Sequence, residues 1–506
     1  MSALSTSALF AAVSILFLAF IFLRRARHRY PPGPQGWPLI GNLFNAPTSF
    51  EWLVYLEWSR KYNSDIVHFE VLGTHYVVLN SAKAAADLFE RRSHIYSDKP
   101  GAPMIEMTGL DKNIGLMKYS DHWRANRRLF HQYFRSTVVS TYHPLTARAV
   151  RELIYALSKE PSQFEKHIRK MAGANILRII YGMEVESEDD SYMVVIDDVL
   201  HAISTVASSR AYLVDSFPIL RHVPAWFPGA KFKREIAKWR VSVEEMYMRP
   251  FRELKVAFES GHAKPCVLTN MLFDISQDKE GRDPAMLEQV AINTAGTAYS
   301  AAADTITLAL INFILAMLMH PEVQERAQEE IVSILGPDKL PEMEDQDSLP
   351  FITAVMKESL RWRPPLPLAV PHRAVVDDEY NGYHIPAGSV VIGNGWAIMH
   401  DNSRYPDPES FNPARFLDHE GKLRKDVPDP MQAFGYGRRI CPGRYFVFDT
   451  LWMTEANILA VFSIQKPQDE LGNAVEPGGE YTSGTFSFPT PFEARFQRRD
   501  GAGSLS

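Results

Sequence analysis

The sequence predicts a mainly α-helical protein with small β-sheets, in which one large domain follows an N-terminal membrane anchor. Three observations favour this fold class. The first residues form an uncharged apolar run, the stretch from 121 to 335 is mostly helical in pattern, and short segments elsewhere resemble strands. With 506 residues, 46% of them hydrophobic, the chain can bury a large core.

The N-terminus has the pattern of a retained anchor. Residues 1–23 carry no charged side chain, and about 20 residues are enough to span the apolar core of a bilayer. Basic residues follow directly, whereas a cleaved signal peptide carries its positive charge before the apolar run. We expect a single-pass anchor over 1–23, with the remainder cytosolic by the positive-inside rule. A cleaved signal peptide is the alternative.

The next segment, residues 24–42, is basic and proline-rich. Its prolines at 31, 32, 34 and 38 fix φ and disfavour a helix, which is typical of a stiff hinge. No clear linker follows residue 42. We therefore expect residues 43–506 to form a single domain.

The soluble part begins with a predicted β-hairpin. Residues 66–79 alternate around Gly73, and Ser81 then caps a short helix. The longest helical run opens at Asp283-Pro284 and lasts to Met319, which corresponds to roughly 50 Å at 1.5 Å per residue. A helix of this length must cross the whole domain.

Further helices are predicted over residues 350–363 and 444–464, and short strands over 382–394 and 481–496. The loop 217–229 is unusually apolar and aromatic. It is either buried or in contact with a membrane surface beside the anchor.

Charge and cysteine content exclude several function classes. The net charge is −6, which argues against a nucleic-acid surface, because such a surface needs a basic field. Two cysteines, Cys266 and Cys441, cannot build a disulfide framework or a four-cysteine metal site.

Cys441 stands in an unusually constrained segment, FGYGRRICPG, which covers residues 434–443. Its glycines permit a tight turn, and the cysteine precedes an apolar helix whose N-terminus favours a thiolate. A dinucleotide fingerprint would need a third glycine where Ile440 stands. The pattern therefore indicates a nucleophile or a metal ligand, with a buried structural cysteine as the alternative.

This segment resembles the signature of the cytochrome P-450 family of haem-thiolate monooxygenases, Phe-Gly-x-Gly-x-Arg-x-Cys-x-Gly. The fixed positions are filled by Phe434, Gly435, Gly437, Arg439, Cys441 and Gly443. The resemblance implies a cytochrome P-450 fold that holds haem b between the long central helix and the helix after the cysteine loop. It implies that Cys441 is the axial iron ligand, that Arg439 pairs with a haem propionate, and that the loop containing Phe434 and Gly443 binds the haem.

Two further motifs occur in the order found in the family. Glu358 and Arg361 are three residues apart on a predicted helix and share a face, and FNPARF supplies Arg415. The resemblance implies that these three side chains form a buried ionic cluster with a structural role. An isolated ExxR pattern would otherwise indicate an exposed ion pair of little energetic consequence.

Three more residues match positions that contact haem propionates in the family: Trp123 and Arg127 in WRANR, and His372 in PHR. For Trp123 and Arg127 the alternative is a core tryptophan and a solvated arginine. His372 follows a proline and is equally compatible with a turn.

The long helix carries Asp304 and Thr305 in an otherwise apolar run. Buried polar groups need partners or a function. By resemblance, this pair relays protons during oxygen activation. Ala302 stands where the family usually has glycine, and Ile306 replaces a second hydroxyl. The alternative for Thr305 is a hydrogen bond to a helix carbonyl.

The resemblance extends from the anchor and the proline-rich hinge through Phe496 and is greatest to microsomal fungal members used in secondary metabolism. It implies an NADPH- and O₂-dependent monooxygenase of the endoplasmic reticulum membrane, in contact with membrane lipid, that oxidises an apolar small molecule. We expect a terpenoid first, and an aromatic polyketide or indole alkaloid second. A haem-thiolate isomerase or dehydratase and a non-catalytic haem-binding protein are the alternatives.

No flavin or nicotinamide motif is present, so electrons are expected from a separate NADPH-cytochrome reductase, with cytochrome b5 as an additional donor. Basic residues on the cysteine side are candidate docking contacts: Arg124, Arg128, Arg438 and Arg444. By family analogy, the substrate pocket is lined by Ala301, residues 366–370 and the region of Phe486, and residues 98–118 form a mobile lid.

Overall fold

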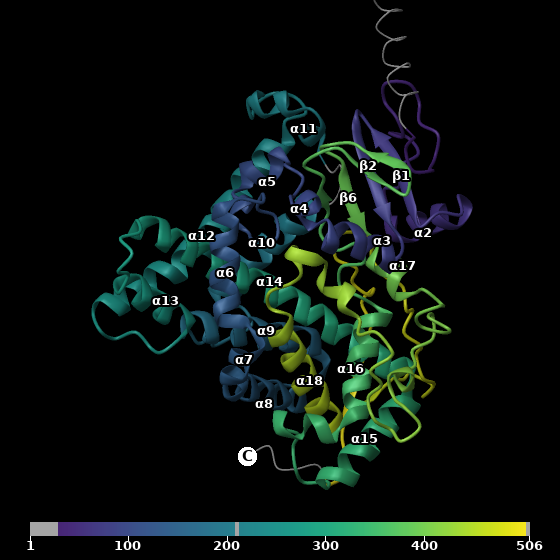
Figure 1. Cartoon of the computed structure of the whole chain (residues 1–506). Helices are drawn as coiled ribbons and strands as arrows, with labels where there is room; N and C mark the ends of the chain where they lie inside the picture. The colour runs from purple at the N-terminus through teal and green to yellow at the C-terminus, as the bar shows by residue number, and fades with distance from the viewer. Residues whose placement is uncertain (1–28, 208–211, 502–506) are drawn as a thin grey trace, which may run out of the picture.

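A computed structural model describes residues 29–207 and 212–501 of the chain. The anchor expected over residues 1–23 lies outside the described residues, as does the start of the hinge. In the described part, helices form most of the molecule and the strands form three small sheets (Figure 1).

The helices of the N-terminal half are α2 (Glu51–Lys61), α3 (Ala82–Ala85), α4 (Ser93–Tyr96), α5 (Pro103–Thr108), α6 (Asp121–Phe134), α7 (Ser136–Val139), α8 (His143–Lys159), α9 (Phe164–Tyr181) and α10 (Ser191–Ala207). Those that follow are α11 (Leu213–Ser216), α12 (Lys231–Glu259), α13 (Val267–Ser276), α14 (Pro284–Met319), α15 (Pro321–Leu335), α16 (Pro350–Trp362), α17 (Gly395–Met399) and α18 (Arg444–Val461). The strands are β1 (Ile66–Val71), β2 (Thr74–Leu79), β3 (His372–Arg373), β4 (Asp378–Tyr380), β5 (Tyr383–Ile385), β6 (Val390–Gly393), β7 (Phe462–Gln465) and β8 (Arg495–Arg498).

Helix α14 is the centre of the core, and its predicted extent is confirmed. Asp283 caps it by accepting a hydrogen bond from the Ala285 N–H (3.0 Å), and Pro284 occupies its first turn. The helix packs against α6, α9 and α18. Within the described residues, only α14 is long and apolar enough to span a membrane, but 89% of its most apolar window is buried inside the protein. It is therefore the core helix of the domain.

The largest sheet has the order β1-β2-β6-β3. The predicted hairpin is confirmed, because β1 and β2 pair antiparallel from Ile66–Leu79 to Val71–Thr74. Strand β6 adds parallel to β2, and β3 adds antiparallel to β6. This pairing brings His372, some 300 residues along the chain, to the edge of a sheet that begins near the N-terminus.

Most other expected elements are confirmed, with two differences. Ser81 caps α3 by accepting from the Ala84 N–H (3.1 Å), but a π-helical turn over Ala86–Arg91 follows. The strand predicted over 481–496 is mostly wrong, since β8 begins only at Arg495. Pro489 and Pro491 lack the N–H that a sheet ladder requires, which accounts for the irregular stretch.

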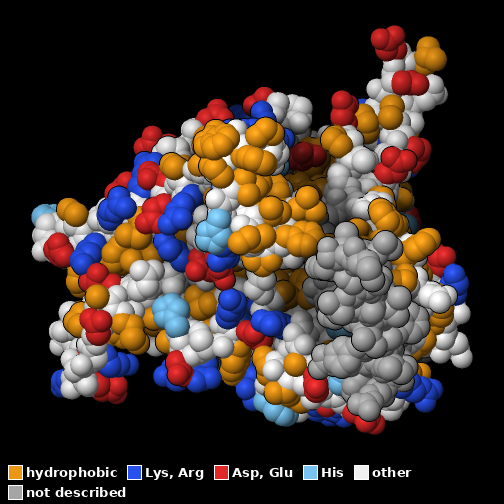
Figure 2. All heavy atoms as spheres, turned by 90° about the horizontal axis from the view of Figure 1, so that it is seen from above, with side chains coloured by type: hydrophobic (Ala, Val, Ile, Leu, Met, Phe, Trp, Pro, Cys, Tyr) orange, Lys and Arg blue, Asp and Glu red, His pale blue; other side chains and the backbone are white. Residues whose placement is uncertain are grey.

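The apolar loop 217–229 is on the surface, so burial, one of the two alternatives for this loop, is excluded. Ile219 is 74% exposed and Trp226 is 79% exposed. The loop follows α11, and hydrophobic side chains gather on this face of the molecule (Figures 1 and 2).

Candidate functional site

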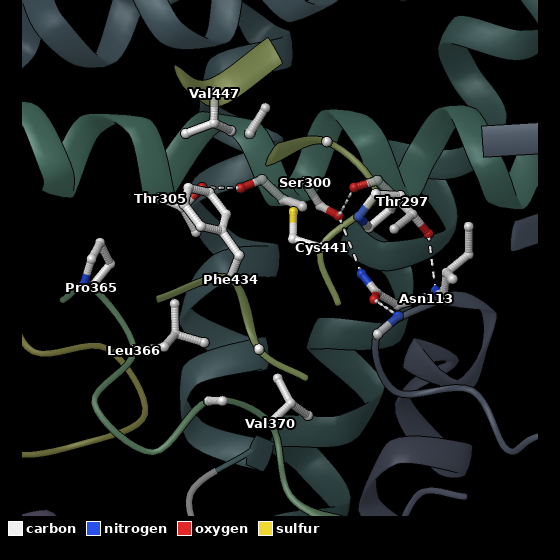
Figure 3. A pocket seen from close by; sticks show the side chains of 18 of the residues that line it. Asn113, Thr297, Ser300, Thr305, Pro365, Leu366, Val370, Phe434, Cys441 and Val447 are labelled. Atoms are coloured by element: carbon white, nitrogen blue, oxygen red, sulfur yellow. Dashed lines mark hydrogen bonds between the residues drawn. The ribbon is translucent and has the colours of Figure 1, made fainter. Parts of the chain in front are cut away.

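A cavity of about 280 Å³ lies between the middle of α14 and the loop that leads into α18 (Figure 3). Its walls are mostly apolar and include the expected lining residues Ala301, Leu366, Val370 and Phe486. Cys441, from the constrained segment, borders the same space. The cavity therefore joins the two parts of the sequence that carry the candidate chemistry.

The loop before Cys441 is held in a shape that depends on Gly437. This glycine has φ +51°, and a Cβ placed there would lie 2.0 Å from the carbonyl oxygen of Phe89. The Cys441 N–H donates to the carbonyl of Phe434 (2.7 Å), which closes the turn. Close packing on the π-helical turn thus fixes the position of the Cys441 sulfur at the cavity wall.

Burial raises the pKa of the Cys441 thiol, although the N–H groups of Gly443 and Arg444 and the charge of Arg127 act in the opposite direction. The position before a helix led us to expect a thiolate. In the structure, desolvation outweighs the helix N-terminus. A sulfur in this setting becomes a stable thiolate when a metal ion binds it.

A cluster of basic side chains borders one end of the cavity: Lys99, Arg127, His372 and Arg439. Arg439 donates to the carbonyls of Ser97 (2.7 Å) and Ile114 (3.1 Å), but its second terminal nitrogen is buried without a hydrogen-bond partner among the described residues. Burial lowers the pKa of Arg439 to about 10, and likewise that of Arg127. This end of the cavity is therefore suited to bind anionic groups.

Lys99 belongs to this cluster and was missed in the sequence. Its ammonium group is buried and donates to the carbonyls of Val370 (2.7 Å) and Pro371 (3.1 Å). Burial, together with the charge of Arg439, lowers the pKa of Lys99 well below its usual value. The contacts span about 270 residues of sequence, so local sequence around Lys99 gives no signal for them.

His372 and Trp123 are held in place by backbone carbonyls. The Nδ1–H of His372 donates to the carbonyl of Tyr96 (2.6 Å), and burial lowers the pKa of the ring well below its usual value, so the ring is neutral. Trp123 donates to the Ile114 carbonyl (3.2 Å), and the Arg439 guanidinium lies over its ring at 4.2 Å. Trp123 lies outside the cavity wall and supports Arg439 from behind.

On α14, Asp304 and Thr305 both border the cavity. The Thr305 hydroxyl donates to the carbonyl of Ala301 (2.7 Å), so the hydrogen bond to the helix backbone considered above is present. Asp304 is buried, and desolvation raises its pKa to about 6. A carboxyl group with this pKa exchanges protons readily near neutral pH.

Asp304 is connected to the surface through two neighbouring helices. The Arg169 guanidinium of α9 lies 3.9 Å from the Asp304 carboxylate and also pairs with Asp197 of α10. Arg169 lowers the pKa of Asp304, whereas Asp197 raises it. Arg169 is 35% exposed and Asp197 is 52% exposed, so this chain of charges reaches solvent.

Away from the cavity, Glu358, Arg361 and Arg415 lie together. Arg361 makes two hydrogen bonds with the Glu358 carboxylate (2.7 and 2.8 Å), and Arg415 adds a third (3.2 Å). The side chains of Glu358 and Arg361 are fully buried. Arg361 also donates to the carbonyls of Met399 (3.0 Å) and Pro408 (2.8 Å), so the cluster ties α16 to the segment before the cysteine loop.

Known proteins that are similar to this chain were found by sequence, and they are consistent with the residues at this site. Residues 31–480 match the sequence model of the family described as cytochrome P450. A cytochrome P450 monooxygenase of Armillaria gallica is 39% identical over 97% of this chain and 96% of its own length. Cytochrome P450 monooxygenase 98 of Postia placenta is 40% identical, over 96% of this chain and 93% of its own. Tryptamine 4-monooxygenase of Psilocybe cyanescens is 36% identical, over 96% and 97%.

Proposed function

The chain belongs to the cytochrome P450 family and is a haem-thiolate monooxygenase, and we propose that it takes electrons from NADPH to oxidise an apolar secondary metabolite. One observation carries the proposal: a mostly apolar cavity borders both Cys441 and the Asp304-Thr305 pair. Such a space binds its ligand by burial of apolar surface. A terpenoid is the first substrate class that we propose. An indole or aromatic polyketide is the second, and the tryptamine 4-monooxygenase relative favours the indole.

The residues at the cavity fit a haem with two propionates. Cys441 presents a sulfur ligand, and the Arg439 guanidinium has a buried nitrogen without a partner. The Arg127 guanidinium likewise makes no hydrogen bond with the part of the chain that the structure describes, and two carboxylates would offset the crowding of cations there. We assign Cys441 as the iron ligand and Lys99, Arg127, His372 and Arg439 as the propionate end of the site, with Trp123 supporting Arg439.

When bound, the haem would bind and activate O₂, and its thiolate ligand favours cleavage of the O–O bond. The apolar walls exclude water and hold the substrate. Asp304 would exchange its proton with solvent, the charges of Arg169 and Asp197 setting its pKa, and pass the proton to the Thr305 hydroxyl. To receive it, Thr305 must release or share its hydrogen bond to the Ala301 carbonyl, so its hydroxyl can alternate between two partners.

Electron delivery is proposed to come from a separate reductase that docks on the cysteine side. Arg128 is exposed there, and Arg444 donates to the Cys441 carbonyl (3.1 Å). Arg124 pairs with Asp121, and Arg438 donates to the Tyr119 hydroxyl (2.9 Å). Arg444 is half-buried and also donates to the Tyr445 hydroxyl (2.8 Å), so Arg128 is the best candidate for direct contact with an acidic partner surface.

We also propose that the enzyme is attached to the endoplasmic reticulum membrane, with the loop 217–229 touching the lipid surface. Leu213 and Phe217 are 69% and 45% exposed, and Ile219, Trp226 and Phe227 extend the same apolar face. An exposed patch of this kind marks an interaction surface. Tryptophan is suited to the membrane interface, because its ring has both an apolar body and a polar N–H.

Oxygen labelling tests the proposed function. Membranes that contain the protein and an NADPH-dependent reductase would be incubated with ¹⁸O₂ and a set of terpenoids and indoles. We expect a product that carries one labelled oxygen atom and forms only with NADPH, and none from Cys441→Ser. Conversion without NADPH or label would instead indicate an isomerase or dehydratase, and haem binding without any product would indicate a binding protein.

A further inference from the structure

Thr485 borders the cavity from the C-terminal segment of the chain, and its side chain is half-buried. Outside the residues assigned above to the haem and to the relay, it is the one polar side chain of the described cavity wall that is neither hydrogen-bonded nor enclosed. Asn113, Thr297 and Ser300 pair with neighbouring groups of the protein and are at most 9% exposed. The Tyr436 hydroxyl is fully enclosed. A ligand in the cavity can therefore pair with the Thr485 hydroxyl.

The turn that carries Thr485 is closed across its base and tied to the cavity wall. The Thr482 N–H donates to the carbonyl of Phe488 (2.7 Å), and the Phe488 N–H donates to the Thr482 hydroxyl (3.0 Å). The Ser487 N–H donates to the carbonyl of Pro365 (3.1 Å), which also borders the cavity (Figure 3). These hydrogen bonds hold the backbone around Thr485 in place, so its hydroxyl offers a ligand a defined position.

The cavity wall has no free carboxylate for a cationic ligand. Asp304 is the only acidic residue among the described lining residues, and its side chain is 10% exposed and lies 3.9 Å from the Arg169 guanidinium. At the cationic end, the guanidinium groups of Arg127 and Arg439 match the two carboxylates that we propose there. No negative charge is left over for a protonated amine, and an unpaired charge is costly to bury in an apolar site.

We propose that Thr485 determines which polar group the substrate carries: a neutral group, such as a hydroxyl or a carbonyl, that hydrogen-bonds to the Thr485 hydroxyl, and not a protonated amine. This inference rests on the proposed function and specifies its substrate class. A threonine hydroxyl donates to a hydroxyl or carbonyl oxygen and accepts from a hydroxyl. It carries no charge with which to offset that of an ammonium group. The substrate is therefore an oxygenated terpenoid or a neutral indole.

Four compounds with one skeleton separate the polar contact from the charge: p-menthane, menthol, trimethylmenthylammonium, and the carbon isostere of the last, in which a tert-butyl group replaces the trimethylammonium group. The quaternary ammonium is charged at every pH and has no lone pair with which to bind a metal. Dissociation constants would be measured by equilibrium dialysis with the purified, haem-loaded, full-length protein. The wild-type protein should bind the cation at least about tenfold more weakly than its isostere.

Thr485→Val tests the hydrogen bond, because it removes the hydroxyl with little change of shape. The ratio of the affinities for menthol and p-menthane should fall about fivefold, the effect of one hydrogen bond. The ratio cancels any change that affects both compounds equally. Thr485→Ser keeps the hydroxyl and should preserve the wild-type ratio. An unchanged ratio in Thr485→Val, or binding of none of the four compounds by the wild-type protein, would overturn the inference.

Thr485→Asp tests the charge selection as a gain of function. The new carboxylate gives the cation a partner inside the cavity, so the affinity for trimethylmenthylammonium relative to its isostere should rise about tenfold or more. Thr485→Asn, which has the same shape without the charge, should show no such rise. Failure of Thr485→Asp to gain affinity would overturn the inference. Equally tight binding of the cation and its isostere by the wild-type protein would also overturn it, and loss of that binding in Asp304→Asn would assign the cation to Asp304.

Product analysis separates this inference from the proposed function. NADPH-dependent oxidation of menthol by a protein whose affinity ratio is unchanged in Thr485→Val would refute the Thr485 contact and leave the monooxygenase assignment intact. Affinity ratios that change as expected, without any NADPH-dependent product, would support the Thr485 contact and refute the proposed electron source and reaction.

Discussion

Two charged clusters in this molecule are built from the same residue types but differ in how completely they are satisfied. Glu358, Arg361 and Arg415 form a dense network in which each charged group has several short hydrogen bonds and water is excluded. Among the described residues, Asp304 has one ion-pair partner, Arg169 at 3.9 Å, while Asp197 adds a like charge, and Arg169 reaches the surface. The first arrangement fixes three charges, and the second leaves a carboxyl group able to change its protonation.

The comparison shows that burial alone does not decide what an ionic cluster does. Complete pairing stabilises the charged forms and links distant segments, as Arg361 does with the carbonyls of Met399 and Pro408. Incomplete pairing leaves the desolvation of Asp304 largely uncompensated, which raises its pKa to about 6. The first situation suits the structural role that we propose for Glu358, Arg361 and Arg415, and the second suits the proton-transfer role that we propose for Asp304.

The largest effect is expected from Arg361→Ala. It would leave the fully buried Glu358 carboxylate without its main partner, a change that costs about 3–5 kcal/mol of unfolding free energy. We expect little folded protein, measured as soluble yield and denaturant midpoint. Arg424→Ala, which removes an exposed pair with Asp426, is the control and should leave the denaturant midpoint close to that of the wild type. Similar stability of the two variants would show that the network is not structural.

Asp304→Asn should have the opposite profile, with folding retained and turnover reduced. Removing a group that transfers protons lowers rates by about 100-fold or more. Product formation and peroxide release per NADPH would be measured with reconstituted enzyme, and Asp304→Glu, which keeps the carboxyl group, should be affected less. Full turnover by the asparagine variant would remove Asp304 from the relay.

The pH dependence of stability is a third, smaller effect. Because the pKa of Asp304 is raised from 3.8 to about 6 on folding, the folded state holds an extra proton between these values. The contribution of Asp304 to stability therefore falls as pH rises through this window and levels off above about pH 6. Asp304→Asn removes this penalty, so its stability relative to wild type should be about 1 kcal/mol more favourable at pH 8 than at pH 5. Thermal denaturation at both pH values measures this difference, and a constant difference would contradict the raised pKa.

The smallest effect is expected from Arg169→Gln. Since Arg169 lowers the pKa of Asp304, its loss should raise that pKa further and shift the pH at which the stability profile levels off upward by less than about one pH unit. Turnover should fall only severalfold. Lys238→Gln, which removes a surface pair with Asp198 on the same helix as Asp197, should leave the profile in place. A shift of the same size in both variants would mean that general surface charge, and not the Arg169 contact, tunes Asp304.

The fold was predictable where the residues that determine an element are adjacent in the sequence. The Asp283-Pro284 start of α14 and the hairpin around Gly73 were visible, because capping and turn chemistry depend on adjacent residues. The prediction of a strand over 481–496 was mostly wrong, because strand formation depends on residues that are not adjacent in the sequence. Its apolar and polar alternation was present, but pairing depends on a partner strand and on the prolines within it.

The candidate site was predictable only where residues belong to a continuous motif. Cys441 and Arg439 lie within one ten-residue segment, so the pattern was recognisable. Lys99 and Arg169 were missed, because their contacts are with residues far along the chain and nothing in their neighbours indicates burial. The raised pKa of the Cys441 thiol was missed for a similar reason, since desolvation is set by the whole domain.

The hydrogen bonds of Asp98 affect how ligands could enter the cavity. Its carbonyl accepts from the Arg373 N–H and its carboxylate from the Tyr119 N–H, both at 2.8 Å, so the two ends of the segment expected to act as a lid are joined at one residue and tied to β3. Lys99 is fixed beside it through the carbonyl of Val370. Any widening of an entrance at this segment would be confined to residues 100–113, because the Ile114 carbonyl accepts from Arg439 and Trp123. Admission of a ligand and retention of the cofactor would then be independent, because residues 100–113 could move while the cationic end keeps its dimensions.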